Sequence, residues 1–136
     1  MSNALDELLP HRPPMRWIDK LAECAETSAV ATVNFANNSL AVADGWVLET
    51  ALVECVAQTV AAALGHRACA RGRSGLPISG MLTSVSNFRI LARAPAGTLL
   101  RIEVRELRRL GMMLMVSGTV SREGQIVAAG ELTLYA

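Results

Sequence analysis

Glu54 is the side chain with the clearest capacity for chemistry, because it lies inside a long apolar stretch. Residues 46–64, WVLETALVECVAQTVAAAL, contain five polar side chains: Glu49, Thr50, Glu54, Gln58 and Thr59. If this stretch is a helix, Glu54 shares a face with small or apolar residues, Thr50 and Gln58 excepted. A carboxylate among such neighbours is poorly solvated and is suited to general acid or base catalysis. The alternative is a structural glutamate that is bound to a backbone group or to an arginine.

Glu49 and His11 are the next candidates. Glu49 lies near the start of the expected helix, where the helix dipole favours a negative charge, so its structural interpretation is the stronger one. His11 lies within the sequence PHRPP, and imidazole is the usual group for proton transfer near neutral pH. With His66 as the second of two histidines, a histidine-rich metal site is not expected.

The composition limits the class of protein. The chain has 136 residues, which fits a single domain over residues 1–136, and 51% of them are hydrophobic whereas 18% are charged. So little charge indicates that further surface is buried in an oligomer. The net charge of +1 and the aromatic content of 4% supply neither the electrostatic field nor the stacking surface that nucleic-acid binding needs.

Three further features predict a cytoplasmic protein without a membrane span. The three cysteines have no CxxC spacing, and their odd number argues against a disulfide framework. The first residues, MSNALDELLPHRPP, lack the charged start and apolar run of a signal peptide. Two carboxylates within residues 46–64 argue against a transmembrane helix, because each would be costly at the centre of a bilayer.

The residues up to the end of the long apolar stretch predict a short helix, a β-hairpin and a long helix. Residues 4–9 form a helical turn that Pro10 ends. Residues 15–24 and 28–35 are expected to be strands joined by a short connection. Asp44 is the expected N-cap of a helix that continues to about residue 70, and Gly65 is expected to weaken its last turns.

The remaining residues predict an antiparallel meander. A loop rich in Gly, Ser and Pro over residues 72–80 precedes strands at 81–92, 98–110, 112–122 and 125–135. Glu123-Gly124 is expected to be the tight turn between the last two strands. Because hairpins rather than βαβ crossovers connect the strands, the fold class is α+β, with one antiparallel sheet wrapped around one long central helix.

This order of elements resembles the hotdog fold, and three motifs are similar to those of the 3-hydroxyacyl-ACP dehydratases of fatty acid synthesis. Leu8–Met15 (LLPHRPPM), followed by Ile18–Lys20, resembles their Leu-Pro-His-Arg-aromatic-Pro-Phe opening and the Val-Asp-Arg after it. Val53–Gln58 (VECVAQ) resembles the Glu-Ala-Leu-Ala-Gln of their central helix. Arg93–Leu99 (RAPAGTL) resembles a turn in which they have Arg-Pro-Val-x-Pro-Gly-Asp-x-Leu. Together the motifs cover nearly the whole chain.

The resemblance implies an activity, a partner and a set of site residues. The family removes water from a 3-hydroxyacyl thioester on acyl carrier protein (ACP), without a cofactor or metal, in a homodimer whose sheets join edge to edge and whose acyl tunnel lies at the interface. Glu54 matches the helix carboxylate that protonates the leaving hydroxyl, and Gln58 matches the neighbouring glutamine. Backbone N–H groups at the helix start would polarise the thioester carbonyl. The residues expected to contact the substrate are Gly45, Trp46, Val47, Ala51 and Gln58.

The family's catalytic histidine has no counterpart here. In the family it lies in a Gly-His-Phe-Pro stretch just before the central helix, whereas residues 37–44 read NNSLAVAD. The chain better resembles a divergent branch, including dehydratases of aryl polyene gene clusters, which shares the Pro-His-x-x-Pro-Met opening and lacks the usual histidine. Two explanations stay open: His11 supplies the imidazole beside Glu54, or the protein is a non-catalytic hotdog partner that binds acyl chains or completes another subunit's site.

The reaction, the carrier and the oligomer each allow a second interpretation. In a hotdog thioesterase, Glu54 would instead activate water against the thioester. Arg67, Arg71 and Arg73 either form a solvated helix end or dock an acidic carrier protein. The carrier is ACP or coenzyme A, and the oligomer is a homodimer or is shared with a paralogue.

Overall fold

A computed structural model describes residues 5–9, 11–12, 14–72 and 81–135 of the chain. A short helix, α1 (Leu5–Leu8), precedes the strands, and a long helix, α2 (Glu49–Ala70), lies between the fourth and fifth strands. The strands are β1 (Lys20–Cys24), β2 (Ser28–Asn34), β3 (Val42–Ala43), β4 (Trp46–Val47), β5 (Met81–Ile90), β6 (Leu99–Leu110), β7 (Met113–Arg122) and β8 (Gln125–Tyr135).

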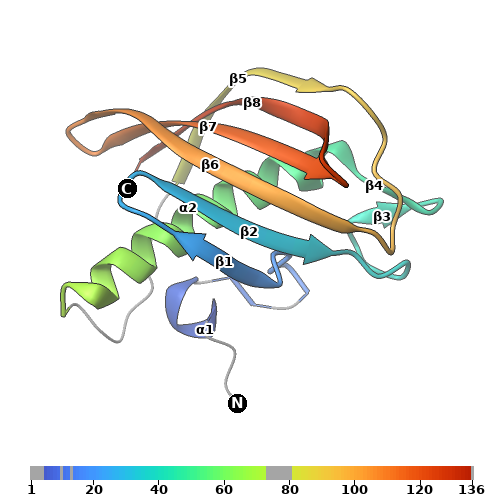
Figure 1. The fold of residues 1–136 in the computed structure, drawn as a ribbon, viewed down its shortest axis with the longest axis horizontal. Helices are drawn as coiled ribbons and strands as arrows, with labels where there is room; N and C mark the ends of the chain where they lie inside the picture. Colours follow the sequence, from blue (N-terminus) through green and yellow to red (C-terminus); the bar gives the residue numbers. More distant parts are fainter. Residues whose placement is uncertain (1–4, 10, 13, 73–80, 136) are drawn as a thin grey trace.

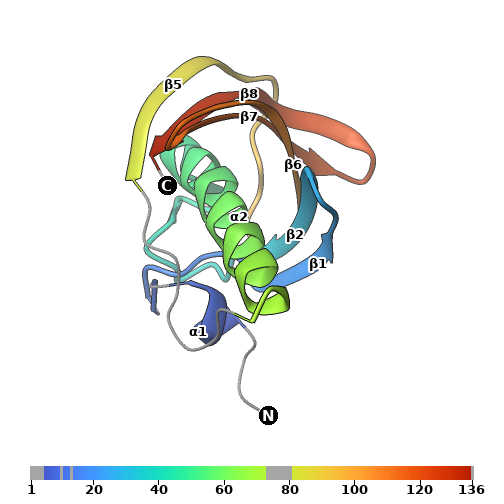
Figure 2. The same cartoon turned by 90° about the vertical axis from the view of Figure 1, so that its left-hand side faces the viewer.

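Six strands form one antiparallel sheet in the order β1-β2-β6-β7-β8-β5, and β3 and β4 pair separately (Figure 1). The sheet curves around α2, which runs through its concave side (Figure 2). In β6 the buried Ile102 and Val104 alternate with the outward Arg101 and Glu103, as expected for a sheet with one covered face. The predicted α+β fold, a sheet wrapped around one helix, is confirmed.

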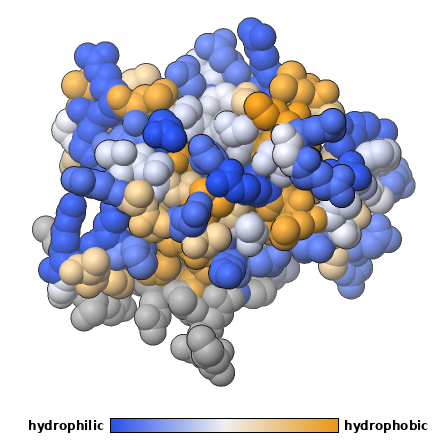
Figure 3. Space-filling view, in the orientation of Figure 1, coloured by the Kyte–Doolittle hydropathy of each residue, from blue (hydrophilic) through white to orange (hydrophobic). Residues whose placement is uncertain are grey.

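The outer face of the sheet carries the charged side chains. Arg101 donates a hydrogen bond to Glu103 over 2.8 Å, and Arg105 lies 3.9 Å from the same glutamate. Hydrophilic residues cover much of the surface seen from this side, with hydrophobic ones between them (Figure 3). The outer face of β6 is therefore polar.

Helix α2 is buried on several sides, as its apolar sequence predicts. Leu52, Cys55 and Val56 are fully buried and belong to the same core as Leu100 and Leu132 of the sheet. In the part of the chain that the structure describes, no helix is long and apolar enough to cross a membrane.

Two glycines permit close contacts of α2. Gly65 lies against the backbone of α1, so that a Cβ there would come within 2.7 Å of the Leu8 carbonyl oxygen. Gly118 of β7 faces Val56, whose Cγ1 would overlap with an added Cβ. Helix α2 continues to Ala70, as predicted, and Gly65 lets α1 lie close to it; a weakening of the last turns by Gly65 stays a prediction.

The predicted strand over residues 15–24 is too long. Met15 lies in a turn, its N–H donating to the Arg12 carbonyl over 2.9 Å, and β1 begins at Lys20. The extended residues 16–19 do not pair fully with the sheet, since the backbone N–H groups of Trp17 and Ile18 donate to a side chain of α2.

The predicted N-cap at Asp44 is wrong. Asp44 and Gly45 have φ values of 52° and 81°, and they form the two-residue turn of the β3–β4 hairpin, in which Ala43 pairs with Trp46. A two-residue turn with both φ values positive favours Asp-Gly. Helix α2 consequently begins at Glu49, with Leu48 as an N-cap that makes no side-chain hydrogen bond. The predicted Glu123-Gly124 turn is confirmed, with φ values of 51° and 80°.

We predict that Gly118→Ala lowers the free energy of unfolding by about 1–3 kcal/mol, because the new methyl group overpacks the contact with Val56. Chemical denaturation measures the change. Ser117→Ala, the neighbouring position on the outer side of β7, is the control, with an expected change within about 0.5 kcal/mol. The Val56→Ala/Gly118→Ala double variant should lose less stability than the two single variants summed. If the stability losses of the two single variants add exactly, the contact with Val56 is not the cause of the loss in Gly118→Ala.

Candidate active site

The structure brings His11 and Glu54 together from two separate elements. Glu54 lies in the second turn of α2, and His11 lies in the N-terminal arm, which we define as residues 11–19 without Pro13. The His11 Nε2 atom is 3.3 Å from Glu54 Oε1, and the two side chains are 33% and 34% exposed. Both groups are therefore reachable from solvent and close enough to interact electrostatically.

The amide of Gln58 fixes the arm against α2. Its Oε1 accepts hydrogen bonds from the backbone N–H groups of Trp17 (2.9 Å) and Ile18 (3.4 Å). Its Nε2 donates to the Met15 carbonyl (2.9 Å) and to Glu54 Oε1 (3.3 Å). An amide offers two donors and two acceptor positions, so these four bonds use its full capacity.

This arrangement changes the role expected for Gln58. The residue is 1% exposed, and no hydrogen-bonding position of its amide is left for a substrate. The geometry supports a positioning function, in which Gln58 orients the Glu54 carboxylate and holds the arm that carries His11.

The two nitrogens of His11 have different surroundings. Nε2 faces Glu54, whereas Nδ1 is buried and has no hydrogen-bond partner. Cys55, which follows Glu54 on α2, is also buried; burial and the Glu54 charge both raise the pKa of its thiol. The Cys55 thiol therefore stays protonated near neutral pH and is a core side chain.

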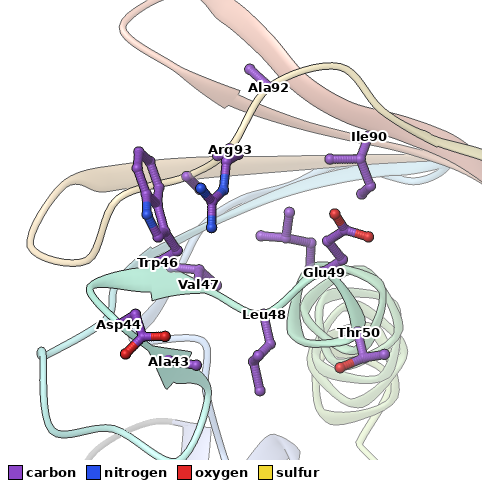
Figure 4. Close-up of a pocket in the computed structure, with 12 residues that line it drawn as sticks. Ala43, Asp44, Trp46, Val47, Leu48, Glu49, Thr50, Ile90, Ala92 and Arg93 are labelled. Carbon is purple, nitrogen blue, oxygen red and sulfur yellow. The ribbon is translucent and has the colours of Figure 1, made fainter.

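A cavity of about 390 Å³ lies at the N-terminal end of α2, within the usual size range of small-molecule sites (Figure 4). Trp46 and Arg93 form one side, with the guanidinium carbon 4.2 Å from the centre of the indole ring. Glu49 points toward Ile90 on the other side (Figure 4). Thr50 also lines the cavity, and Glu54 lies one helical turn beyond it, outside the lining.

The residues expected to contact the substrate are distributed unevenly around this cavity. Trp46 and Val47 line it. Gly45 lies in the adjacent hairpin turn, where its carbonyl accepts a hydrogen bond from Ala96 over 2.9 Å. Ala51 is fully buried in the core, so its side chain is unavailable to a ligand in this structure.

The arginines expected to dock a carrier protein lie at the opposite, C-terminal end of α2. Arg67 donates hydrogen bonds to the carbonyl groups of Ala25 (2.9 Å) and Ser28 (3.3 Å), so it connects the helix to the β1–β2 hairpin. Arg71 is exposed, and Arg73 lies outside the described residues. Docking by Arg71 and Arg73 stays a prediction, whereas Arg67 has a structural function.

Sequence reasoning missed the position of Arg93. The sequence shows it as the first residue of a turn motif, but a cation stacked on Trp46 depends on the pairing of two distant segments.

Among the described residues, no group of three or more His, Cys, Asp or Glu side chains is placed to hold a metal ion.

Comparison with known sequences gives the family. A family model described as ApeP-like, ApeP dehydratase, matches residues 3–136. The 3-hydroxyacyl-[acyl-carrier-protein] dehydratase FabZ of Clostridium perfringens is 28% identical over 139 residues, covering 96% of this chain and 94% of the relative. The dehydratase-like family expected from the sequence motifs is thereby confirmed.

Solved structures agree on the fold. The dehydratase heterocomplex ApeI:P from Xenorhabdus doucetiae aligns with a TM-score of 0.88 at 21% identity, over 96% of this chain and 89% of that one. The smu.793 protein from Streptococcus mutans, bound to acetyl CoA, aligns with a TM-score of 0.69 at 15% identity, over 94% of both chains. A hypothetical thioesterase from Streptococcus pneumoniae aligns with a TM-score of 0.66 at 14% identity, over 85% of this chain and 86% of that one.

We predict that Gln58→Met lowers the free energy of unfolding by about 2–4 kcal/mol, because it leaves the N–H groups of Trp17 and Ile18 without a partner. Amide hydrogen exchange should also accelerate at Trp17 and Ile18 before it does so in the sheet. Gln125→Met, at the exposed first residue of β8, is the control and should change stability by less than about 0.5 kcal/mol. Unchanged exchange at Trp17 would contradict the role given to the amide.

Proposed function

The chain belongs to the ApeP-like dehydratase family, and on this premise we propose that it removes water from a 3-hydroxyacyl thioester to give the trans-2-enoyl thioester. The observation that carries this proposal is the Glu54 carboxylate, one-third exposed and in contact with His11, on the helix that borders the cavity. Elimination needs a group that takes a proton from the α-carbon and a group that protonates the leaving hydroxyl. A carboxylate is able to perform both steps.

The cavity supports a site for the thioester end of the substrate. Val47, Leu52, Ile90 and Ala94 supply apolar lining suited to carbon atoms. The first turn of α2 opens at the same place, and its N-cap, Leu48, leaves the first backbone N–H groups without a side-chain acceptor. These N–H groups are suited to polarise the thioester carbonyl, and a polarised carbonyl makes the α-proton more acidic.

The carrier of the acyl chain is proposed to be an acyl carrier protein. The support is the name of the FabZ relative, which is a dehydratase of acyl-carrier-protein substrates. Synthesis of fatty acids or polyenes on such a carrier is the corresponding pathway. The free thiols of Cys24, Cys55 and Cys69 fit a reducing, cytoplasmic location.

A second subunit is proposed to pair with the edge strand β5. Among the described strands β5 pairs with β8 alone, and its free edge carries exposed apolar side chains such as Met81 and Val85. An exposed apolar edge of a sheet is a template for pairing with another strand. The second subunit is another copy of this chain or a paralogue, and the heterocomplex named for the Xenorhabdus structure supports the paralogue.

We predict that Glu54→Gln lowers the rate of enoyl-thioester hydration by at least about a thousandfold, because the amide can neither accept nor deliver the reacting protons. The measurement follows the gain of one water by a trans-2-enoyl-ACP, read by mass. Glu26→Gln, in the exposed β1–β2 turn, is the matched control and should retain the wild-type rate. Persistent hydration by Glu54→Gln would remove Glu54 from the mechanism.

The same assay separates the two competing functions. A thioesterase would release free acid from the acyl-ACP instead of adding water to the double bond. A non-catalytic partner would bind acyl-ACP without turning it over, and its Glu54→Gln variant would bind equally well. Activity that appears when a paralogous hotdog subunit is added would assign the chain to a shared site.

We predict that the purified protein is a dimer or larger by size exclusion with light scattering, and that Val85→Lys shifts it toward the monomer. Val85 is 46% exposed on the edge strand, and a lysine there opposes strand pairing. Leu99→Lys is the control, because Leu99 is 62% exposed on β6, away from the edge. A monomeric wild type at micromolar concentration, alone and with a paralogue, would contradict pairing at β5.

A further inference from the structure

We infer that two copies of this chain associate through the outer faces of their sheets, at the end where β6 turns into β7, on the left of Figure 1. The surface involved is the outer apolar patch, which we define as Met81, Leu110, Met112, Met113, Met115 and Tyr135. This contact of face with face differs from the edge pairing proposed for β5, and it does not depend on the proposed dehydratase function.

The strand register places four side chains of the patch in one row across the sheet. Leu110 of β6 is paired with Met113 of β7, and Met113 is paired with Tyr135 of β8. Tyr135 is also paired with Met81 of β5. Directly paired residues project to the same face of a sheet, and these four are 36–66% exposed, whereas the next residue of β7, Leu114, is buried. The row therefore lies on the outer face.

The other two methionines make the patch continuous. Met115 lies two residues after Met113 on β7, so it projects to the same face, and it is 36% exposed. Met112 lies in the β6–β7 turn, where its Sδ accepts a hydrogen bond from the Tyr135 hydroxyl over 3.3 Å. Flexible methionine side chains adapt to a contacting surface, and a contiguous exposed apolar patch indicates an interaction site.

The opposite end of β6 provides a contrast. Leu99 is 62% exposed there, but the hollow that it borders is also lined by Arg101, Glu103 and Glu123. A single exposed leucine among charged side chains is common on protein surfaces and needs no partner. The apolar row is therefore a feature of one end of the outer face.

A neighbouring row of the same face carries opposite charges on the two sides of β7. Arg105 of β6 is paired with Ser117 of β7, and Ser117 is paired with Glu131 of β8. The Arg105 side chain is 62% exposed, and none of the ion pairs in the described part of the chain includes Glu131. Two strand spacings separate these charges by about 10 Å, which is too far for an ion pair within one chain.

A twofold axis along β7 makes this face complementary to itself. Rotation about this axis brings β6 of one copy over β8 of the other, at the same level along the strands. Arg105 of each copy then faces Glu131 of the other, across a spacing of about 10 Å between packed sheets that the two long side chains are able to bridge. The same rotation brings Leu110 over Tyr135. Such an isologous interface is closed with two copies.

The mixed charge of this face favours a second copy over other occupants. An acidic carrier protein or an anionic membrane would be attracted by Arg105 but repelled by Glu131. A second copy offers each charge its opposite. The composition agrees, because 51% of the residues are hydrophobic and 18% are charged, and pairing at the β5 edge leaves the outer face uncovered.

Two matched leucines test the inference by size exclusion with light scattering. Leu110→Lys places a charge in the patch, and Leu99→Lys places one at the far end of the same strand and face. We expect Leu110→Lys to halve the mass of the wild-type assembly and Leu99→Lys to leave it unchanged. An unchanged mass for Leu110→Lys would overturn the inference. Halving is expected whether or not the β5 edge pairs, so the two interfaces are tested separately.

A charge exchange tests the twofold axis and does not depend on the leucine variants. The parent protein is Val85→Lys, in which edge pairing is opposed and the outer faces should still join two chains. Arg105→Glu and Glu131→Arg each place like charges opposite one another, so each should raise the dissociation constant at least about tenfold in analytical ultracentrifugation. The double exchange restores opposite charges and should return the constant to within about threefold of the parent. A monomeric parent, or a double variant as weakly associated as the single ones, overturns the inference.

Discussion

The buried amide of Gln58 is the interaction on which the site depends. It joins α2 to the N-terminal arm through three backbone groups, and through Nε2 it also orients Glu54. A polar network in the protein interior stabilises one arrangement when every member is satisfied, and it is costly when a member is not. Because the four bonds of this amide are all made within the chain, the arm has one favourable position against the helix. His11 is brought to Glu54 as a consequence.

The amide can act in this way because α2 itself is fixed on its other sides. Gly118 lets β7 approach Val56, and Gly65 lets α1 lie against the helix backbone. Gly130 of β8 likewise faces Phe88 of β5, where an added Cβ would overlap with the Phe88 backbone. The first two contacts pack α2 closely against α1 and β7, and the third packs β5 against β8. The distances at Glu54 are therefore set by packing of the whole sheet as much as by local hydrogen bonds.

The fold could be predicted from the sequence because its strongest signals are local and periodic. The apolar stretch around Glu54 is long enough for one helix. Side chains of different polarity alternate along the strands after it, and this pattern predicted the antiparallel sheet. The start of the helix was misplaced because Asp44 fits two structures, an N-cap and the first residue of an Asp-Gly hairpin turn, and only the pairing of β3 with β4 decides between them. The functions of Gln58 and Arg67 were missed for a related reason. Each side chain binds backbone groups about 40 residues away, and residue type and spacing do not reveal such partners.

The β3–β4 hairpin also fixes the segment before α2, in which this chain has no histidine. Residues 39–48 use their backbone groups to fix the segment before α2: Val42 donates to Ser39, Leu48 donates to Ala41, and Val47 donates to Ala94. The imidazole that lies near Glu54 within this chain is that of His11, in the arm. The arm approaches Glu54 at Oε1, while Thr50, one helical turn before Glu54, lines the cavity. The cavity and the His11–Glu54 pair therefore lie at neighbouring turns of α2.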